Sequence, residues 1–145
     1  MTRDGAQYST QQTATQIEKE FLVACLCADW CGSCRDYRSA FEALAPRFSG
    51  VRFAWVDVED EPDVAGEIDI DNFPTLVIQR QVAGSACVLF CGAMLPHINQ
   101  LERLLQTLIL QTPDESHAHA ISSPERLAWQ VVGDVQSRLP RRGSV

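Results

Sequence analysis

Two cysteines separated by two residues, Cys31 and Cys34, are the side chains in this sequence best suited to carry out a reaction. A pair at this spacing can close a small disulfide ring and reopen it, and the same spacing supplies half of a zinc site. When such a pair begins a helix, the unpaired N–H groups and the dipole at the helix N-terminus favour the thiolate of the first cysteine. The spacing alone therefore leaves both thiol–disulfide exchange and metal binding open.

The elements around the pair can be predicted from the pattern of apolar residues. The apolar run 21–27 predicts a buried strand directly before the cysteines, and spacings of three and four predict a helix over 34–48 directly after them. Further along, we predict a strand over 51–58, a short helix over 61–68, a hairpin of strands over 75–80 and 86–91, and a last core helix from Pro96. This order predicts an α/β fold, a central mixed β-sheet with helices on both faces.

Composition narrows the class of protein. The chain has 145 residues, of which 46% are hydrophobic and 21% charged, as expected for one globular domain. No stretch approaches the roughly 18 apolar residues of a membrane span, and the N-terminus shows no apolar signal segment. We therefore expect a cytoplasmic protein without a membrane partner. Thiols stay reduced in that compartment, so the six cysteines indicate catalysis, metal binding or burial.

The net charge of −7 argues against nucleic acid as the main partner. Much of the imbalance lies between Arg52 and Arg80, where there are eight acids and no base: Asp57, Glu59, Asp60, Glu61, Asp63, Glu67, Asp69 and Asp71. One interpretation is an ordinary solvated surface. The other is a negative surface that steers basic partners toward the protein.

The two ends of the chain differ from its centre. Residues 1–16 are rich in Gln, Thr and Ser and are predicted to be mostly disordered, and residues 17–111 form the domain. Residues 112–145 are predicted to be a linker (112–116) and a helical extension over 124–139, with Ser123 as its N-cap. The apolar residues of this helix recur at every fourth position: Leu127, Val131, Val135 and Leu139. This helix would pack on its own domain in a monomer or on a second copy in a dimer.

Over residues 17–110 the chain resembles the thioredoxin family. The residues that carry the resemblance are Trp30 before the CGxC sequence, Arg35 directly after it, and Phe73-Pro74-Thr75 further along. The resemblance implies a thioredoxin fold without a cofactor, in which the peptide bond before Pro74 is cis. It also implies that Cys31 attacks a substrate disulfide and that Cys34, which is more buried, resolves the mixed disulfide.

The resemblance assigns supporting roles as well. Trp30 would shield the site and offer an apolar platform, and Arg35 would add positive potential or be an ordinary solvated helix residue. The remaining residues expected to support the site or bind substrate are Gly32, Ser33, Phe73, Pro74, Thr75 and Gly92.

The sequence departs from the family pattern at four places. Cys25 stands where members often bury an aspartate that moves protons, and a thiol with a pKa of about 8.5 accepts a proton less readily than a carboxylate with a pKa of about 3.9, so slow turnover is expected. Ser33 replaces a proline, where its hydroxyl would either stabilise the Cys31 thiolate or simply favour the helix start. Ser39 replaces a second proline, which often kinks the helix. Residues 1–20 show no counterpart of the first strand and helix.

The other cysteines allow two readings. Cys25 and Cys27 alternate onto one side of a buried strand, which favours core packing. Cys87 and Cys91 are predicted to share one face of the later strand. Cys91, beside Gly92 and the expected substrate groove, would be either a third redox thiol or a packing residue.

Three functions follow from these patterns. The first is a thiol–disulfide oxidoreductase that acts on protein disulfides, with a preference for basic partners, and is recycled by a thioredoxin reductase. The second is an assembly chaperone or binding module with little turnover, which reads its partner through the groove beside Pro74. A zinc site is the third and least favoured, because no second ligand pair stands at the usual spacing. We therefore predict no metal.

Overall fold

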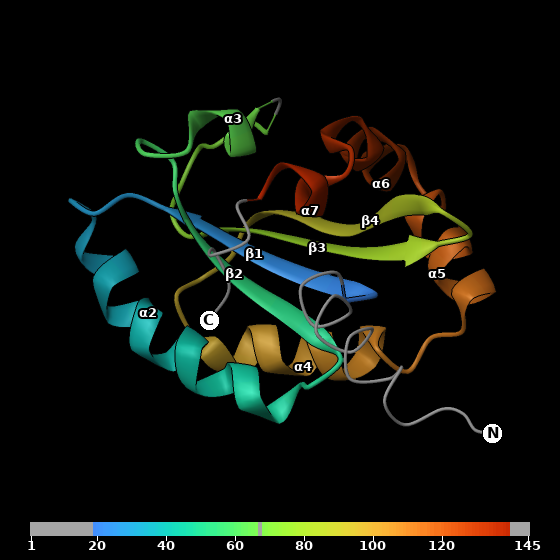
Figure 1. Cartoon of the computed structure of the whole chain (residues 1–145), viewed down its shortest axis with the longest axis horizontal. Coiled ribbons are helices and arrows are strands. Elements are labelled where there is room, and N and C mark those ends of the chain that lie inside the picture. Colours follow the sequence, from blue (N-terminus) through green and yellow to red (C-terminus); the bar gives the residue numbers. More distant parts are fainter. Residues whose placement is uncertain (1–18, 67, 140–145) are drawn as a thin grey trace, which may run out of the picture.

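A four-stranded mixed sheet forms the centre of the protein, as a computed structural model that describes residues 19–66 and 68–139 shows (Figure 1). Its strands are β1 (Phe21–Cys27), β2 (Val51–Asp57), β3 (Thr75–Val82) and β4 (Ser85–Ala93), in the order β2-β1-β3-β4. β1 is parallel to β2 and antiparallel to β3, and β3 is antiparallel to β4. The predicted mixed sheet with flanking helices is confirmed. The predicted disordered tail, residues 1–16, lies outside the described residues.

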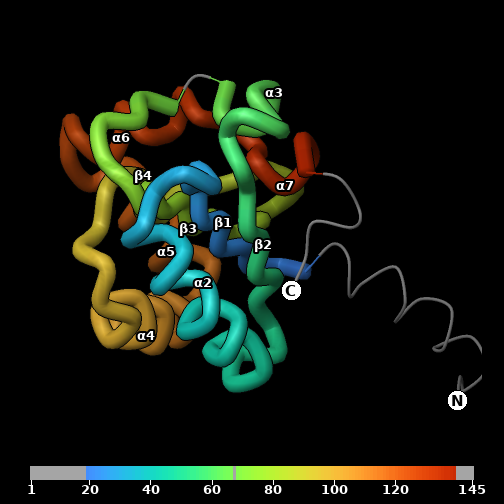
Figure 2. The backbone as a smooth tube through the Cα atoms, turned by 90° about the vertical axis from the view of Figure 1, so that its left-hand side faces the viewer, coloured from blue at the N-terminus to red at the C-terminus, as the bar shows by residue number. Residues whose placement is uncertain are grey.

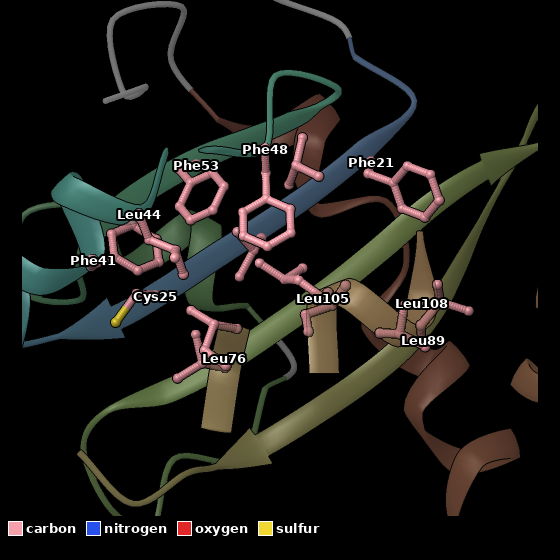
Figure 3. Packing of buried hydrophobic residues seen from close by; sticks show 14 of the residues in the cluster. Phe21, Cys25, Phe41, Leu44, Phe48, Phe53, Leu76, Leu89, Leu105 and Leu108 are labelled. Carbon is pink, nitrogen blue, oxygen red and sulfur yellow. The ribbon is translucent and has the colours of Figure 1, made fainter. Parts of the chain in front are cut away.

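One face of the sheet is covered by two long helices, α2 (Gly32–Leu44) and α4 (Ile98–Leu108) (Figures 1 and 2). Between them and the strands lies the larger core, where the aromatic and leucine side chains pack closely (Figure 3). The helix predicted over 34–48 ends earlier as an α-helix, at Leu44, and residues 45–47 form a 3₁₀ turn. Pro46 explains this change, because it has no N–H to continue the α-helical hydrogen bonds.

The opposite face is covered mostly by the C-terminal segment (Figure 1). α6 (Pro124–Trp129) packs on β4, while α7 (Val135–Arg138) lies beside the short helix α3 (Pro62–Ala65). Val132 and Val135 enter a second core with apolar side chains of β1, β3 and β4. The extension therefore packs on its own domain. No helix in the described ranges is long and apolar enough to cross a membrane.

The predicted linker over 112–116 is wrong, because helix α5 (Pro113–Ala120) begins there. Thr112 and Glu115 form a capping box: the Glu115 N–H donates to Thr112 Oγ1 (3.1 Å), and the Thr112 N–H donates to Glu115 Oε1 (2.8 Å). These reciprocal bonds satisfy N–H groups that would otherwise lack a partner at the helix start. Sequence contained the signal, a threonine followed three residues later by glutamate.

The single helix predicted over 124–139 is also wrong. α6 ends at Trp129, residues 130–132 form a 3₁₀ turn, and the chain bends at Gly133, whose φ of +75° suits a glycine. The break changes which residues face the sheet. Leu127 and Val131, two of the predicted apolar stripe, are 55% and 71% exposed, whereas Val132 is buried.

Cys87 and Cys91 lie on opposite faces of the sheet, which corrects the prediction that they share one. The register of β3 and β4 shifts between Ile78 and Gln79, so that Leu89 is an extra residue in β4. Such a bulge reverses the alternation of side chains beyond it. Cys87 consequently packs in the core under α2 and α4, and Cys91 packs against the second core.

Candidate active site

Cys31 and Cys34 differ in accessibility because of where they stand in α2. Cys31 is the N-cap, held by a bond from its N–H to the Ala28 carbonyl (3.0 Å), and its thiol is free and half-buried. Cys34 is three residues further, inside the first turn, and is only 1% exposed. An accessible thiol at a helix N-terminus is thus followed by a buried cysteine.

The segment containing Pro74 is held in place from two sides. The Phe73–Pro74 peptide bond is cis, and the Pro74 carbonyl accepts a hydrogen bond from the Met94 N–H (3.1 Å). Thr75 begins β3 and donates its hydroxyl to the Asn72 carbonyl (2.6 Å). Gly92 pairs with Leu76 on the neighbouring strand. These bonds fix the backbone where the sequence predicts a substrate groove.

An aromatic contact joins the two predicted halves of the site. The indole of Trp30 stands edge-on to the Phe73 ring, with 5.7 Å between the ring centroids. Its Nε1–H donates to Glu59 Oε2 (3.0 Å), yet the side chain remains 65% exposed. Cys31 and Phe73 pack against the same core. Trp30 therefore forms an exposed apolar surface next to the accessible thiol, with an acidic group at its edge.

The remaining predicted residues belong to the first turn of α2. Gly32 and Ser33 begin α2, and Arg35 follows on its exposed side. Ser33 lines a shallow surface pocket with Asp36, Tyr37 and His97.

The disulfide in this structure joins Cys34 to Cys27, with 5.8 Å between the Cα atoms, and leaves Cys31 free. The sequence favours core packing for Cys27, whereas the structure bonds it to Cys34. The available signal was its place at the end of β1, since the chain passes from there into the helix that carries Cys34. Cys25 adds a further sulfur, 3.9 Å from that of Cys27. Three cysteines thus surround the inner side of the site.

Cys25 is fully buried among apolar side chains of the core (Figure 3). Burial raises the pKa of its thiol well above the usual range, so the group stays protonated at neutral pH. Burial and the neighbouring Cys25 also raise the pKa of Tyr37, whose buried hydroxyl has no hydrogen-bond partner among the residues that the structure describes. A neutral thiol and a neutral phenol therefore lie near each other in the core beneath the site.

Cys91 is separated from these sulfurs by the sheet. It packs against the second core, whereas Cys25, Cys27 and Cys34 belong to the first. Burial, and then the nearby Asp69, raise the pKa of its thiol. This placement favours the packing interpretation of Cys91 over that of a third redox thiol.

Three carboxylates lie together at the edge of the site: Asp29, Asp57 and Asp60. Desolvation opposes ionisation of Asp57, but the N–H groups of Glu59 (2.8 Å) and Asp60 (3.3 Å) donate to it and lower its pKa. The ionised Asp57 in turn raises the pKa of Asp29. Within the described residues this is the only group of three side chains close enough to share a metal ion, and it contains no cysteine.

The thioredoxin family model matches residues 5–94. The thioredoxin of Ovis aries is 33% identical over 104 residues, which cover 72% of this chain and 94% of that protein. Thioredoxin H2 of Arabidopsis thaliana is 39% identical over 62 residues, 43% of this chain and 47% of that protein, so that match spans about half of the relative. The chain belongs to the thioredoxin family.

Solved structures show the same fold. The germline-specific thioredoxin Deadhead of Drosophila melanogaster superposes with a TM-score of 0.56 at 20% identity, covering 74% of this chain and 99% of that one. The thioredoxin of Trypanosoma brucei brucei gives a TM-score of 0.53 at 28% identity, covering 72% and 88%. The family is one of thiol–disulfide oxidoreductases, and this chain has two cysteines, Cys31 and Cys34, at the CxxC spacing.

Proposed function

We propose that the protein reduces or exchanges disulfides in other proteins, with Cys31 as the attacking thiol and Cys34 as the resolving thiol. The observation that carries the proposal is the contact between Trp30 and Phe73, which brings the residue before Cys31 next to the residue before cis-Pro74. An accessible cysteine at a helix N-terminus then lies beside backbone that an extended substrate chain can reach.

The exchange balances in two steps. The Cys31 thiolate attacks one sulfur of the substrate disulfide, and the other sulfur leaves as a thiolate that takes up the proton lost by Cys31. Cys34, deprotonated in turn, attacks Cys31 and releases the second substrate sulfur, which takes up the proton from Cys34. The substrate gains two electrons, and the protein ends with a Cys31–Cys34 disulfide. A thioredoxin reductase would restore the dithiol.

The surroundings favour certain substrates and a modest rate. The exposed Trp30 offers apolar contact, and the carboxylates near it favour substrates with basic side chains. Slow resolution is expected because Cys25, a protonated thiol, occupies the place of a proton-accepting carboxylate. The cytoplasmic location stays a prediction.

Reduction of insulin disulfides by dithiothreitol tests the proposal. We expect the wild-type protein to accelerate insulin precipitation, and Cys31→Ser to lose that acceleration. Cys87→Ser is the matched control, since it removes a buried cysteine of another strand and should leave the rate unchanged. Equal, slow rates for wild type and Cys31→Ser would overturn the proposal.

A variant that traps substrates distinguishes the oxidoreductase from the binding-module alternative. Cys34→Ser leaves Cys31 unable to be resolved, so a working oxidoreductase accumulates mixed disulfides with its substrates in a cell lysate. An empty trap, together with tight non-covalent binding of a partner, would favour an assembly chaperone. Stoichiometric zinc in freshly purified protein would instead favour the metal-site alternative.

A further inference from the structure

Cys34 has two partners within reach, but its single sulfur can bond only one of them at a time. Cys31 lies one helical turn before it at the CxxC spacing, and Cys27 is bonded to it across the junction of β1 and α2. The Cα separation of 5.8 Å between Cys27 and Cys34 lies within the range of ordinary disulfides. No displacement of strand or helix is needed for this bond.

We propose that Cys27 is a third redox-active thiol. By internal thiol–disulfide exchange it replaces Cys31 as the partner of Cys34, so that the disulfide of the oxidised protein lies in the core. The inference deepens the proposed function and rests on it, because the Cys31–Cys34 disulfide that Cys27 opens is the product of substrate reduction.

The exchange changes partners without a net change of oxidation state. The Cys27 thiolate attacks the Cys34 sulfur, a Cys27–Cys34 bond forms, and the Cys31–Cys34 bond breaks. Cys31 leaves with the electron pair of the broken bond. It then takes up the proton that Cys27 released, so one disulfide and one thiol are present before and after. No external oxidant or reductant takes part in this step.

Cys25 has a positioning role in this scheme. Its sulfur lies 3.9 Å from that of Cys27, and in the oxidised form only Cys25 of the two carries a hydrogen to donate. The S–H is a weak donor, but both groups are buried and water does not compete for them. Donation toward Cys27 stabilises its sulfur whenever that atom carries negative charge, which occurs both when it attacks and when it leaves.

After internal exchange, the oxidised protein carries a free thiol at its surface and its disulfide in the core. The Cys27–Cys34 disulfide is buried, since both residues are 1% exposed, while Cys31 becomes a free thiol at the half-buried N-cap. That thiol can still attack a disulfide but has no resolving partner. The protein would then hold its target as a mixed disulfide until a reductant releases Cys34.

Disulfide mapping of the full chain tests the proposal directly. Reduced protein is oxidised with diamide, free thiols are blocked with N-ethylmaleimide during unfolding, and the chain is cut by trypsin and by a protease that cleaves before aspartate. These cuts separate residues 20–28, with Cys25 and Cys27, from residues 29–35, with Cys31 and Cys34. We expect the two peptides to be linked through Cys27 and Cys34, with Cys31 blocked.

Substitutions sharpen the result. In oxidised Cys27→Ser, peptide 29–35 should carry an internal disulfide, and blocking of Cys31 should fall to background. Cys87→Ser, another buried strand cysteine of the same core, should give the wild-type map. An internal Cys31–Cys34 disulfide in wild type, or a link through Cys25, would overturn the role of Cys27. The insulin assay tests the proposed function separately, because the wild-type protein can reduce insulin and still show no Cys27–Cys34 disulfide in the mapping.

Discussion

The edge of the Trp30 indole meets the ring of Phe73, and this contact connects the helix that carries the cysteines to the cis-proline segment. The two residues are far apart in the sequence, and both belong to loops. Trp30 is mostly exposed, so the contact contributes more to the shape of the substrate surface than to the stability of the core.

We expect Trp30→Ala to weaken substrate binding. An aromatic contact between the indole and a substrate side chain would be worth about 0.5–1.5 kcal/mol, and losing it corresponds to a rise in KM for insulin of about 2- to 13-fold. Maximal rate and melting temperature should change little, because the side chain is 65% exposed. Leu110→Ala, another exposed apolar residue, is the control and should leave KM unchanged. A large loss of melting temperature for Trp30→Ala would show that the contact is structural.

Asp29→Asn should stabilise the protein at neutral pH. The pKa of Asp29 is raised in the folded state by Asp57, so its ionised form is disfavoured there and opposes folding above the ordinary pKa of 3.8. The advantage of the variant should therefore shrink as the pH falls through the raised pKa of Asp29 and vanish below about 3.8. It should also narrow in high salt. Thermal unfolding across this pH range measures it. Asp36→Asn, which removes one surface carboxylate outside the group of Asp29, Asp57 and Asp60, is the control variant.

Arg80→Ala should destabilise the domain strongly. The buried guanidinium pairs with Glu20, donates to the Gln111 carbonyl (2.8 Å) and to Ser116 Oγ (3.0 Å), and so ties β3 to the start of α5. Losing hydrogen bonds to a charged group costs about 1.5–3 kcal/mol each, although the half-exposed Glu20 reduces the total. We expect a loss of at least about 2 kcal/mol in urea unfolding.

Arg38→Ala is the matched comparison for Arg80→Ala. Arg38 pairs with Glu42 one turn along α2, and both side chains are nearly half exposed. Such a surface pair contributes about 0.3–0.5 kcal/mol. Equal losses for the two variants would contradict the role assigned to the buried network.

Gln79→Leu should loosen the C-terminal segment. The fully buried amide of Gln79 donates to Asp134 Oδ1 (2.8 Å) and accepts from the Val135 N–H (2.8 Å), which holds α7 on the sheet. Leaving the buried N–H without a partner costs about 1–3 kcal/mol. Hydrogen exchange should rise in residues 130–138 more than in β1. Gln81→Leu, which removes one longer bond to Asp134 (3.3 Å), should have a smaller effect.

Patterns among residues that are close in the sequence predicted the strand β1, the helix start after it and the two cysteines of the site. The apolar run predicted β1 with the bounds that the structure has, because a buried strand needs little beyond continuous apolar side chains. The position of Cys31 and Cys34 at the start of a helix also followed from neighbours in sequence. The resemblance carried by Trp30 and Phe73-Pro74-Thr75 led to the family that the comparison confirms.

Only the tertiary structure decided which groups meet. Cys27 reaches Cys34 because α2 packs back onto the end of β1. The alternation of side chains along a strand predicts which face a residue lies on, but not which residue it contacts beyond the next turn. The bulge at Leu89 placed Cys87 and Cys91 on opposite faces, through a register that depends on β3. Gly133 bent the extension so that Val132 rather than Val131 is buried against the sheet. The sequence identified the cysteines that can react, whereas the packing of α2 on β1 determined that Cys34 pairs with Cys27.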